Sequence, residues 1–103
     1  MNPLLTDKID AIGEACQRHG VATLHAFGSV LRDDFDPASS DVDFLVSFLP
    51  RDQGHADAYF GLLEDLEGIL GRHVDLVVER AIRNRYFREA LERQRVPVYD
   101  HAA

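Results

Sequence analysis

The sequence is poor in sulfur and in basic residues, and it contains no tryptophan. Its single cysteine, Cys16, excludes an internal disulfide framework and a multi-cysteine zinc site, and it fits a reducing compartment. The 11 basic residues are outnumbered by 18 acidic ones, which gives a formal net charge of −7. Because phosphate binding needs a net basic face, this balance argues against a protein that coats nucleic acid.

Long apolar stretches are also missing. The N-terminus has neither the basic segment nor the apolar run of a signal peptide. The most apolar run covers 44–49, and Ser47 interrupts it, so it is too short to cross a bilayer. We therefore expect a cytoplasmic protein that does not contact a membrane.

What the sequence does contain is enough for one small core. Its 103 residues are 46% hydrophobic and include six Phe and three Tyr. We expect a single domain over 1–103, because a second substrate-binding domain does not fit into this length. Residues 80–103 carry six arginines and only three acidic residues. This asymmetry indicates either that the two ends face different partners or that a solvated helix is rich in arginine.

Apolar spacing and turn residues predict the order of the elements. In chain order they predict a helix that begins at Asn2–Pro3 and ends at Gly20, a strand over 21–27, a loop over 33–40, a strand over 41–48, a loop over 50–54, a helix closed by Gly71, a strand over 74–78, a helix over 84–94 and a short edge strand over 96–99. Phe87 and Leu91 are expected on the buried side of the last helix. The order predicts an α/β (α+β) domain, with a small mixed β-sheet and helices packed against it.

Three aspartates fall at informative places in these strands. Asp41 and Asp43 are two residues apart at the start of a strand, so they share a face, about 7 Å apart. Asp75 stands alone in an apolar strand, where a charge is unfavourable unless it is paired. If the two strands are neighbours, Asp75 completes a three-carboxylate cluster. Oxygen ligands favour magnesium or manganese over zinc, and two such ions about 4 Å apart suit in-line displacement at phosphorus.

The Gly28-Ser29 pair ends the strand over 21–27. Glycine lets a phosphate approach the backbone, and the start of a following helix would aim N–H groups at the anion. The aspartate-rich stretch over 34–43 is not a calcium loop, because it lacks the central glycine and the distal glutamate. The five histidines show no metal-type pairing and are interpreted as surface or packing residues.

Each of these features also has a plainer interpretation. Asp41 and Asp43 are compatible with a solvated strand edge, since most acidic side chains lie at the surface. Asp75 is compatible with a cap or an ion pair, and Gly28-Ser29 with a simple turn. What favours a site is their combination in the order strand, loop, strand, helix, strand.

This combination resembles a known motif. Gly28-Ser29, then eleven residues, then Asp41-Val42-Asp43 resembles the nucleotidyltransferase motif of the DNA polymerase beta superfamily. The resemblance covers nearly the whole chain, whose length matches the minimal nucleotidyltransferases. These are typically the antitoxin partners of HEPN-domain proteins in prokaryotic toxin–antitoxin pairs. The resemblance implies a polymerase-beta-type nucleotidyltransferase fold.

The resemblance also implies roles for the three acids. Asp41 and Asp43 would hold two Mg²⁺ ions, for which Mn²⁺ is a possible substitute. Asp75 would be the third acid, which helps either with the catalytic metal or as a base. All three would therefore be both metal-binding and catalytic residues.

The same resemblance assigns the nucleotide to the preceding turn. Gly28 and Ser29 would contact the nucleoside triphosphate. Arg32 matches a basic position that follows Gly-Ser in the minimal proteins, often within Gly-Ser-x-Ala-Arg-Gly. Here Leu31 replaces the alanine and Asp33 the final glycine, and Asp33 brings a negative charge near the expected triphosphate.

The function implied by the resemblance is transfer of AMP from ATP, once or several times, to a hydroxyl of a partner protein. That partner would be a HEPN ribonuclease toxin, and the acceptor a tyrosine near its ribonuclease site. A domain this small has little room for a substrate pocket of its own, so the partner would present the acceptor. The added nucleotide would block RNA by its bulk and its negative charge.

Two other functions stay open. In the first, the protein is a binding antitoxin that neutralises its partner without chemistry, and the basic segment over 80–95 is its docking surface. The presence of all three acids favours the enzyme over this alternative. In the second, the protein transfers a nucleotide to a small molecule such as an aminoglycoside. The missing second domain argues against that activity.

Overall fold

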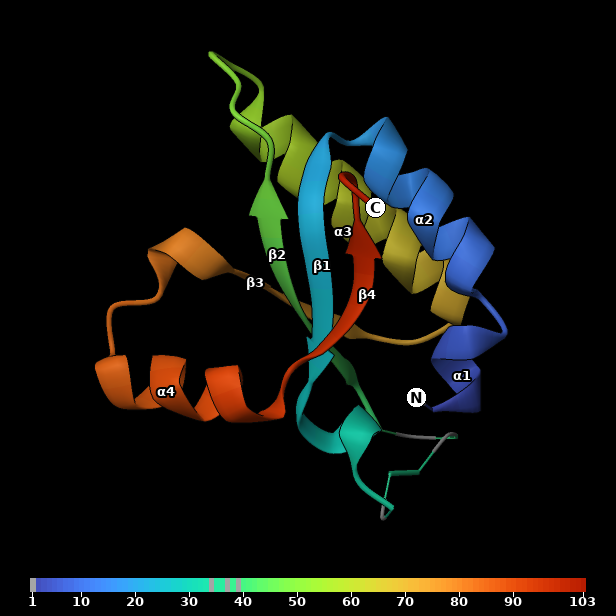
Figure 1. Ribbon diagram of the computed structural model, residues 1–103. Coiled ribbons are helices and arrows are strands. Elements are labelled where there is room, and N and C mark those ends of the chain that lie inside the picture. Colours follow the sequence, from blue (N-terminus) through green and yellow to red (C-terminus); the bar gives the residue numbers. More distant parts are fainter. Residues whose placement is uncertain (1, 34, 37, 39) are drawn as a thin grey trace.

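The computed structural model describes residues 2–33, 35, 36, 38 and 40–103. Figure 1 shows the predicted order of elements, with two short 3₁₀ helices added. The elements are α1 (Pro3–Thr6), α2 (Ile9–Arg18), β1 (Val21–Phe27), η1 (Gly28–Leu31), β2 (Val42–Phe48), α3 (His55–Leu70), β3 (Val74–Val78), η2 (Glu79–Ala81), α4 (Arg85–Gln94) and β4 (Val96–Asp100). Across the described part of the chain, every helix is too short or too polar to cross a membrane.

The strands form one mixed sheet in the order β3-β2-β1-β4. β1 is antiparallel to both of its neighbours, whereas β2 and β3 are parallel and are connected through α3. The helices α2 and α3 lie together on one side of the sheet, and α4 lies on the other side (Figure 1). This arrangement confirms the predicted α/β domain with a small mixed sheet and helices packed against it.

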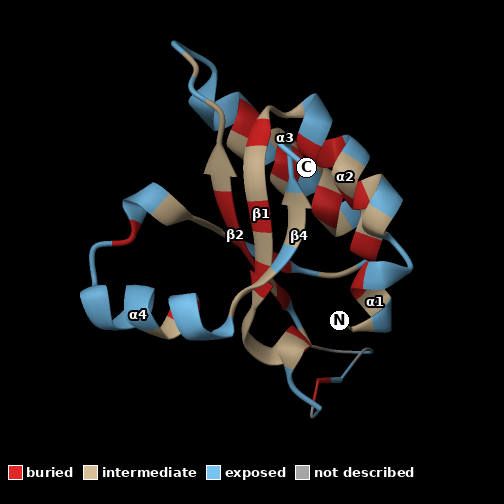
Figure 2. Ribbon diagram, viewed as in Figure 1, coloured by how far each residue is buried: buried red, intermediate tan, exposed pale blue. Residues whose placement is uncertain are grey.

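The main core lies between the sheet and the helices α2 and α3 (Figure 2). Val42, Phe44 and Val46 of β2 are fully buried there. They belong to the same cluster as Leu62 and Leu66, which are fully buried side chains of α3. Because strand residues alternate between faces, this packing turns the residues between them toward the opposite side of the sheet.

A smaller apolar cluster holds α4 and η2 to that opposite side. It consists of the buried residues Leu45, Ile82 and Leu91. The predicted start of the last helix is confirmed, since the Asn84 side chain accepts hydrogen bonds from the backbone of the first turn of α4.

Phe87 lies on the predicted side of α4, toward the sheet, but it is not buried there. It is 42% exposed, whereas Leu91 is 4% exposed. Helical spacing puts the two residues on the same face of α4. Only Leu91, near the end that leads into β4, reaches the cluster of buried residues on the sheet.

The predicted first helix is divided in two. α1 ends at Thr6 and α2 begins at Ile9, because Lys8 leaves the helical conformation (φ −112°, ψ 11°). The residues between the two helices are exposed and put no apolar side chain into the core that would hold a continuous turn there. Leu5 and Ile12 are nevertheless both fully buried, so each piece packs as the apolar spacing predicts.

Candidate active site

The parallel pairing of β2 with β3 brings the predicted aspartates together. Asp43 lies opposite Asp75, and the preceding pair is Val42 with Val74. The pairing continues one residue further, because the Val42 amide donates a hydrogen bond to the His73 carbonyl (3.3 Å). Residues two positions apart on a strand share a face. The four side chains that meet in this way, called the acidic square below, are Asp41, Asp43, His73 and Asp75.

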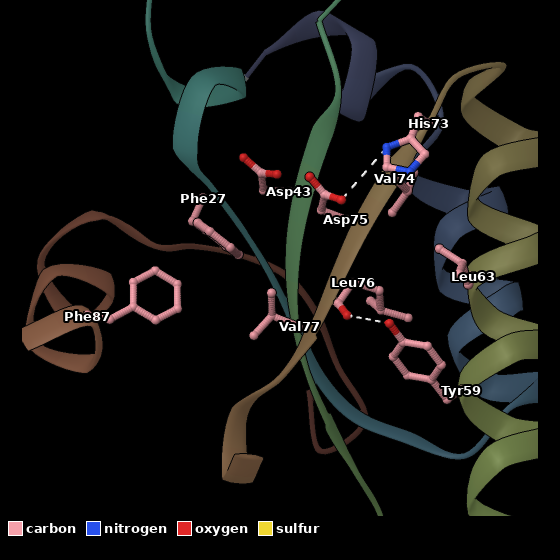
Figure 3. A pocket seen from close by; sticks show the side chains of 10 residues that line it. All are labelled: Phe27, Asp43, Tyr59, Leu63, His73, Val74, Asp75, Leu76, Val77 and Phe87. Atoms are coloured by element: carbon pink, nitrogen blue, oxygen red, sulfur yellow. Dashed lines mark hydrogen bonds and ion pairs between the residues drawn. The ribbon is translucent and has the colours of Figure 1, made fainter. Parts of the chain in front are cut away.

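His73 lies against two of the three carboxylates. Its Nδ1 atom is 3.3 Å from Oδ2 of Asp41 and 3.8 Å from Oδ1 of Asp75, the contact drawn in Figure 3. His73 lies at the surface, as expected for the histidines, but it also joins a group of side chains that could hold a metal ion, which was not expected. The signal was in the sequence, because His73-x-Asp75 repeats the two-residue spacing of Asp41-x-Asp43.

Asp75 is also more open to solvent than an apolar strand suggests. Its side chain is 54% exposed, because β3 is an edge strand of the sheet. Asp41 is similarly open, with 53% of its side chain exposed. A charge at either position therefore keeps much of its hydration, and neither carboxylate needs a buried partner.

Asp43 is the least exposed of the three acids, and its surroundings oppose its negative charge. Burial raises its pKa to about 6, together with a hydrogen bond to Asp75 and the charges of Asp75 and Asp41. The positive charge of Arg32 acts in the opposite direction. Near neutral pH, the acidic square therefore crowds negative charges that repel one another.

The chemistry of these side chains fits a divalent cation. Single ligand atoms of Asp41, His73 and Asp75 all lie within 4.8 Å of one another. The carboxylate of Asp43 shares a hydrogen bond with Asp75, so it lies at the same place. A bound cation would relieve the repulsion among the carboxylates, as hard divalent ions do with oxygen ligands.

Gly28 lets the turn after β1 pass close to this cluster. Its backbone is left-handed (φ +74°), and a Cβ atom built there would collide with Oδ2 of Asp43. The hydroxyl of Ser29 donates a long hydrogen bond to the Asp41 carbonyl (3.5 Å). The predicted Gly-Ser turn and the predicted aspartates therefore adjoin.

The turn continues into a small cavity that contains Arg32. This cavity, called the Arg32 cavity below, has a volume of about 400 Å³ and is lined by Gly28, Leu31, Arg32, Gln94 and Val96. The helix that begins at Gly28 is the single 3₁₀ turn η1, which ends at Leu31. Anion binding on this side would depend on Arg32 and on the Gly28-Ser29 turn.

An apolar surface borders the carboxylates on the sheet face that α4 covers, and the sequence did not reveal it. Phe27 pairs with Asp43 in the β1–β2 register, and Val77 follows Asp75 by two residues. The ring of Phe87 meets that of Phe27 edge to face, with centroids 6.2 Å apart. We call Phe27, Val77 and Phe87 the aromatic wall. Together with the carboxylates of Asp43 and Asp75 they line a cavity of about 490 Å³ (Figure 3).

The family described as "Nucleotidyltransferase domain" matches residues 9–98. The chain therefore belongs to the nucleotidyltransferase domain family. This confirms the resemblance noted in the sequence.

Individual relatives agree with this assignment. The chain is 33% identical over 75 residues to the "putative protein adenylyltransferase MJ1379" of Methanocaldococcus jannaschii, across 73% of this chain and 74% of the relative. A solved structure of a "putative minimal nucleotidyltransferase" superposes with a TM-score of 0.75 at 35% identity, across 90% of this chain and 91% of that one. A solved structure described as a tri-AMPylated Shewanella oneidensis HEPN toxin in complex with MNT antitoxin contains a chain that matches with a TM-score of 0.62 at 20% identity, across 99% of this chain and 75% of that one. This last likeness is one of fold.

The close approach of Gly28 to Asp43 leads to a first prediction. Gly28→Ala should destabilise the protein, because a left-handed alanine is unfavourable by about 1–2 kcal/mol and its Cβ displaces the Asp43 carboxylate. Binding of Mn²⁺, measured by calorimetry, should weaken as well. Gly68→Ala is the matched control, since a Cβ at Gly68 of α3 meets nothing within 4 Å. Unchanged Mn²⁺ affinity in Gly28→Ala would contradict the role given to this glycine.

The raised pKa of Asp43 leads to a second prediction. Between the ordinary value of 3.8 and about 6, the folded protein holds a proton that the unfolded chain has lost. Without metal, the melting temperature should therefore fall as pH rises through this window, and Asp43→Asn should remove that component. At pH 7, Mg²⁺ or Mn²⁺ should raise the melting temperature of the wild type more than that of Asp43→Asn.

Asp52→Asn is the control for this experiment, because Asp52 is exposed in the loop before α3. It should keep both the pH dependence and the response to metal. Identical pH profiles and identical metal responses in the wild type and Asp43→Asn would show that Asp43 has neither the raised pKa nor contact with a cation.

Proposed function

We propose that the protein is a magnesium-dependent adenylyltransferase that transfers AMP from ATP to a hydroxyl of a partner protein. The observation that carries this proposal is the acidic square beside the Gly28-Ser29 turn, in a chain of the nucleotidyltransferase domain family. The name of the Methanocaldococcus jannaschii relative supports a protein as the acceptor. We propose that 1–103 act as one catalytic unit in the cytoplasm, where ATP is available.

In this proposal, Asp41, Asp43 and Asp75 hold two Mg²⁺ ions. The ions would stabilise the negative charge of the triphosphate and promote loss of the acceptor proton. The acceptor oxygen forms a bond to the α-phosphorus of ATP, and the bond from that phosphorus to the bridging oxygen breaks. Pyrophosphate leaves, and Asp75 takes up the proton of the acceptor hydroxyl.

We assign the triphosphate to the side of Gly28, Ser29 and Arg32. The Arg32 cavity adjoins the turn. The positive charge of Arg32 acts on Asp43 and opposes the rise of its pKa. Arginine forms charge-assisted hydrogen bonds with phosphate, which are roughly twice as strong as neutral ones. Ser29 adds a neutral hydrogen bond, whose contribution is about 1 kcal/mol.

We assign the acceptor ring to the other side, against the aromatic wall. Phe87 is 42% exposed and lines the same cavity as Asp43 and Asp75. An aromatic ring that packs there would place a phenolic hydroxyl at the carboxylates. This surface supports tyrosine as the acceptor, because serine and threonine offer no ring to the wall.

We propose a HEPN ribonuclease toxin as the partner that presents this tyrosine. The similar fold of an MNT antitoxin in complex with a tri-AMPylated HEPN toxin supports this proposal. An AMP group on such a partner would exclude RNA by its bulk and charge.

The same partner is compatible with a second function, that of an antitoxin that acts by binding alone. The observation that favours it is the exposed basic side of α4, where Arg85 and Arg93 are exposed and Tyr86 is 69% exposed. Arg95 does not belong to this surface, because it forms ion pairs with Glu79 (3.0 Å) and Glu92 (3.3 Å). An acidic patch on the partner would complement the remaining arginines.

A third prediction separates the two functions. The double variant Asp41→Asn, Asp43→Asn removes two charges at nearly constant side-chain volume, so contacts made by α4 should survive. We expect it to bind the proposed HEPN partner but neither to add AMP to it nor to protect cells from it. The readouts are the intact mass of the partner and growth on co-expression.

The control is the double variant Asp7→Asn, Asp52→Asn, which removes two exposed charges away from the site. It should keep both AMP transfer and protection. Full protection by the Asp41→Asn, Asp43→Asn variant, with no change of partner mass even for the wild type, would contradict the enzymatic function and support the binding antitoxin.

A fourth prediction tests the acceptor side. Phe87→Ala should slow AMP transfer to a tyrosine acceptor about tenfold, since an aromatic pair contributes about 0.5–1.5 kcal/mol. Binding of AMP-PNP, measured by calorimetry, should not change. Phe60→Ala is the control, because Phe60 is 63% exposed on α3 and does not line this cavity. Weaker AMP-PNP binding in Phe87→Ala would instead place the adenine ring against the wall.

A further inference from the structure

We propose that His73 is a direct ligand of the divalent cation and that it gives the acidic square a preference for Mn²⁺ over Mg²⁺. This inference deepens the proposed function and rests on its metal site. It concerns a residue that the aspartate motif does not include, and it predicts which cation the protein takes up when both are present.

The spacing of the three side chains around Nδ1 of His73 supports this role. Six ligands around one ion at about 2.1 Å lie about 3.0 Å apart when adjacent and about 4.2 Å apart when opposite. The observed separations from Nδ1 are 3.3 Å to Asp41 and 3.8 Å to Asp75. Both values lie between the two spacings, and the ligand atoms of Asp41, His73 and Asp75 all lie within 4.8 Å of one another, so small side-chain movements would let the three share one ion.

The register of the strands explains why His73 points there. Asp43 is paired with Asp75, and the Val42 amide bonds to the carbonyl of His73. His73 therefore occupies the position opposite Asp41, one step before the paired strands begin. The backbone that places Asp75 in the cluster places His73 there too, and His73 is 61% exposed, so the ring is free to turn toward an ion.

The other histidines in the described part of the chain have different surroundings. His19 binds Asp65 between α2 and α3 (2.7 Å), and His55 contacts Arg80 (3.4 Å). The ring of His101 lies 3.4 Å from the Ala22 carbonyl. Among the histidines for which contacts are described, His73 is the one whose ring meets two carboxylates of the candidate site.

An imidazole ligand affects the two cations differently. Mg²⁺ prefers oxygen ligands in a strict octahedron and gives up its water reluctantly, whereas Mn²⁺ is a larger and softer transition-metal ion that accepts an imidazole nitrogen more readily. Three carboxylates alone favour either ion. The fourth member of the acidic square adds a nitrogen donor, and this addition favours Mn²⁺.

The test uses the full chain with Mn²⁺ alone, without nucleotide. Electron spin-echo spectroscopy of bound Mn²⁺ detects a ligating ¹⁴N nucleus directly. We expect nitrogen modulation from the wild type and none from His73→Gln. His55→Gln is the matched control, since His55 is exposed and touches no carboxylate of the acidic square; it should keep the signal.

Affinities provide a second readout. His73→Gln should weaken Mn²⁺ binding roughly tenfold or more, whereas its effect on Mg²⁺ binding should be several times smaller. His73→Asp should restore cation binding without the nitrogen signal, because it offers oxygen at the same position. Since His73 is exposed, these variants should keep the melting temperature of the metal-free protein within a few degrees.

Nitrogen modulation that persists in His73→Gln, or that is missing from the wild type with Mn²⁺ bound, would overturn the inference. Equal losses of Mn²⁺ and Mg²⁺ affinity would overturn the preference. AMP transfer by a wild type that shows no nitrogen signal would leave the proposed function standing while this inference fails. A nitrogen signal without any AMP transfer would contradict the proposed function and support the role of His73.

Discussion

The parallel register between β2 and β3 is the constraint on which the candidate site depends. A shift of one residue would turn Asp75 to the opposite face and move Val74, Leu76 and Val78 out of the main core. Two side chains of α3 hold this register at the free edge of β3. The Tyr59 hydroxyl donates to the Leu76 carbonyl (2.7 Å), and the Val74 amide donates to the Glu67 carboxylate (3.0 Å). The crossover helix therefore both connects the two strands and fixes the acids relative to each other.

The same strand serves stability on one face and the site on the other. Phe44 and Val46 are fully buried, and burial of one such side chain contributes about 1.5–3 kcal/mol. Asp43 opposes folding at neutral pH, because burial and neighbouring carboxylates raise its pKa. The packing of Phe44 and Val46 on one face of β2 offsets the unfavourable free energy of the Asp43 charge on the other face. A cation that binds to the folded protein would add stability at the position where the charges reduce it.

Sequence patterns predicted the features that depend on one element at a time. The alternation along β2, the Asn84 cap and the strand that carries Asp75 were all predictable, because each follows from local spacing. His73 was not among the predicted ligands because paired histidines are what indicates a metal site in a sequence, whereas its partners are aspartates: Asp75 two residues further on and Asp41 at the start of the neighbouring strand. The exposure of Phe87 was missed for a related reason: helical spacing puts it on one face with Leu91, but only tertiary packing decides how much of that face reaches the sheet.

The order of residues across the sheet bears on the geometry of the proposed transfer. Asp43 lies between Gly28, whose Cβ would collide with its carboxylate, and Asp75, which is its partner in the register. In-line displacement requires the leaving group and the attacking oxygen on opposite sides of the phosphorus. With the triphosphate at the Gly28 turn and the acceptor at Asp75, the phosphorus would lie over Asp43. The least solvated acid of the site would then be the one nearest to the bond that breaks, where a fixed charge and its bound cation act most strongly because little water screens them.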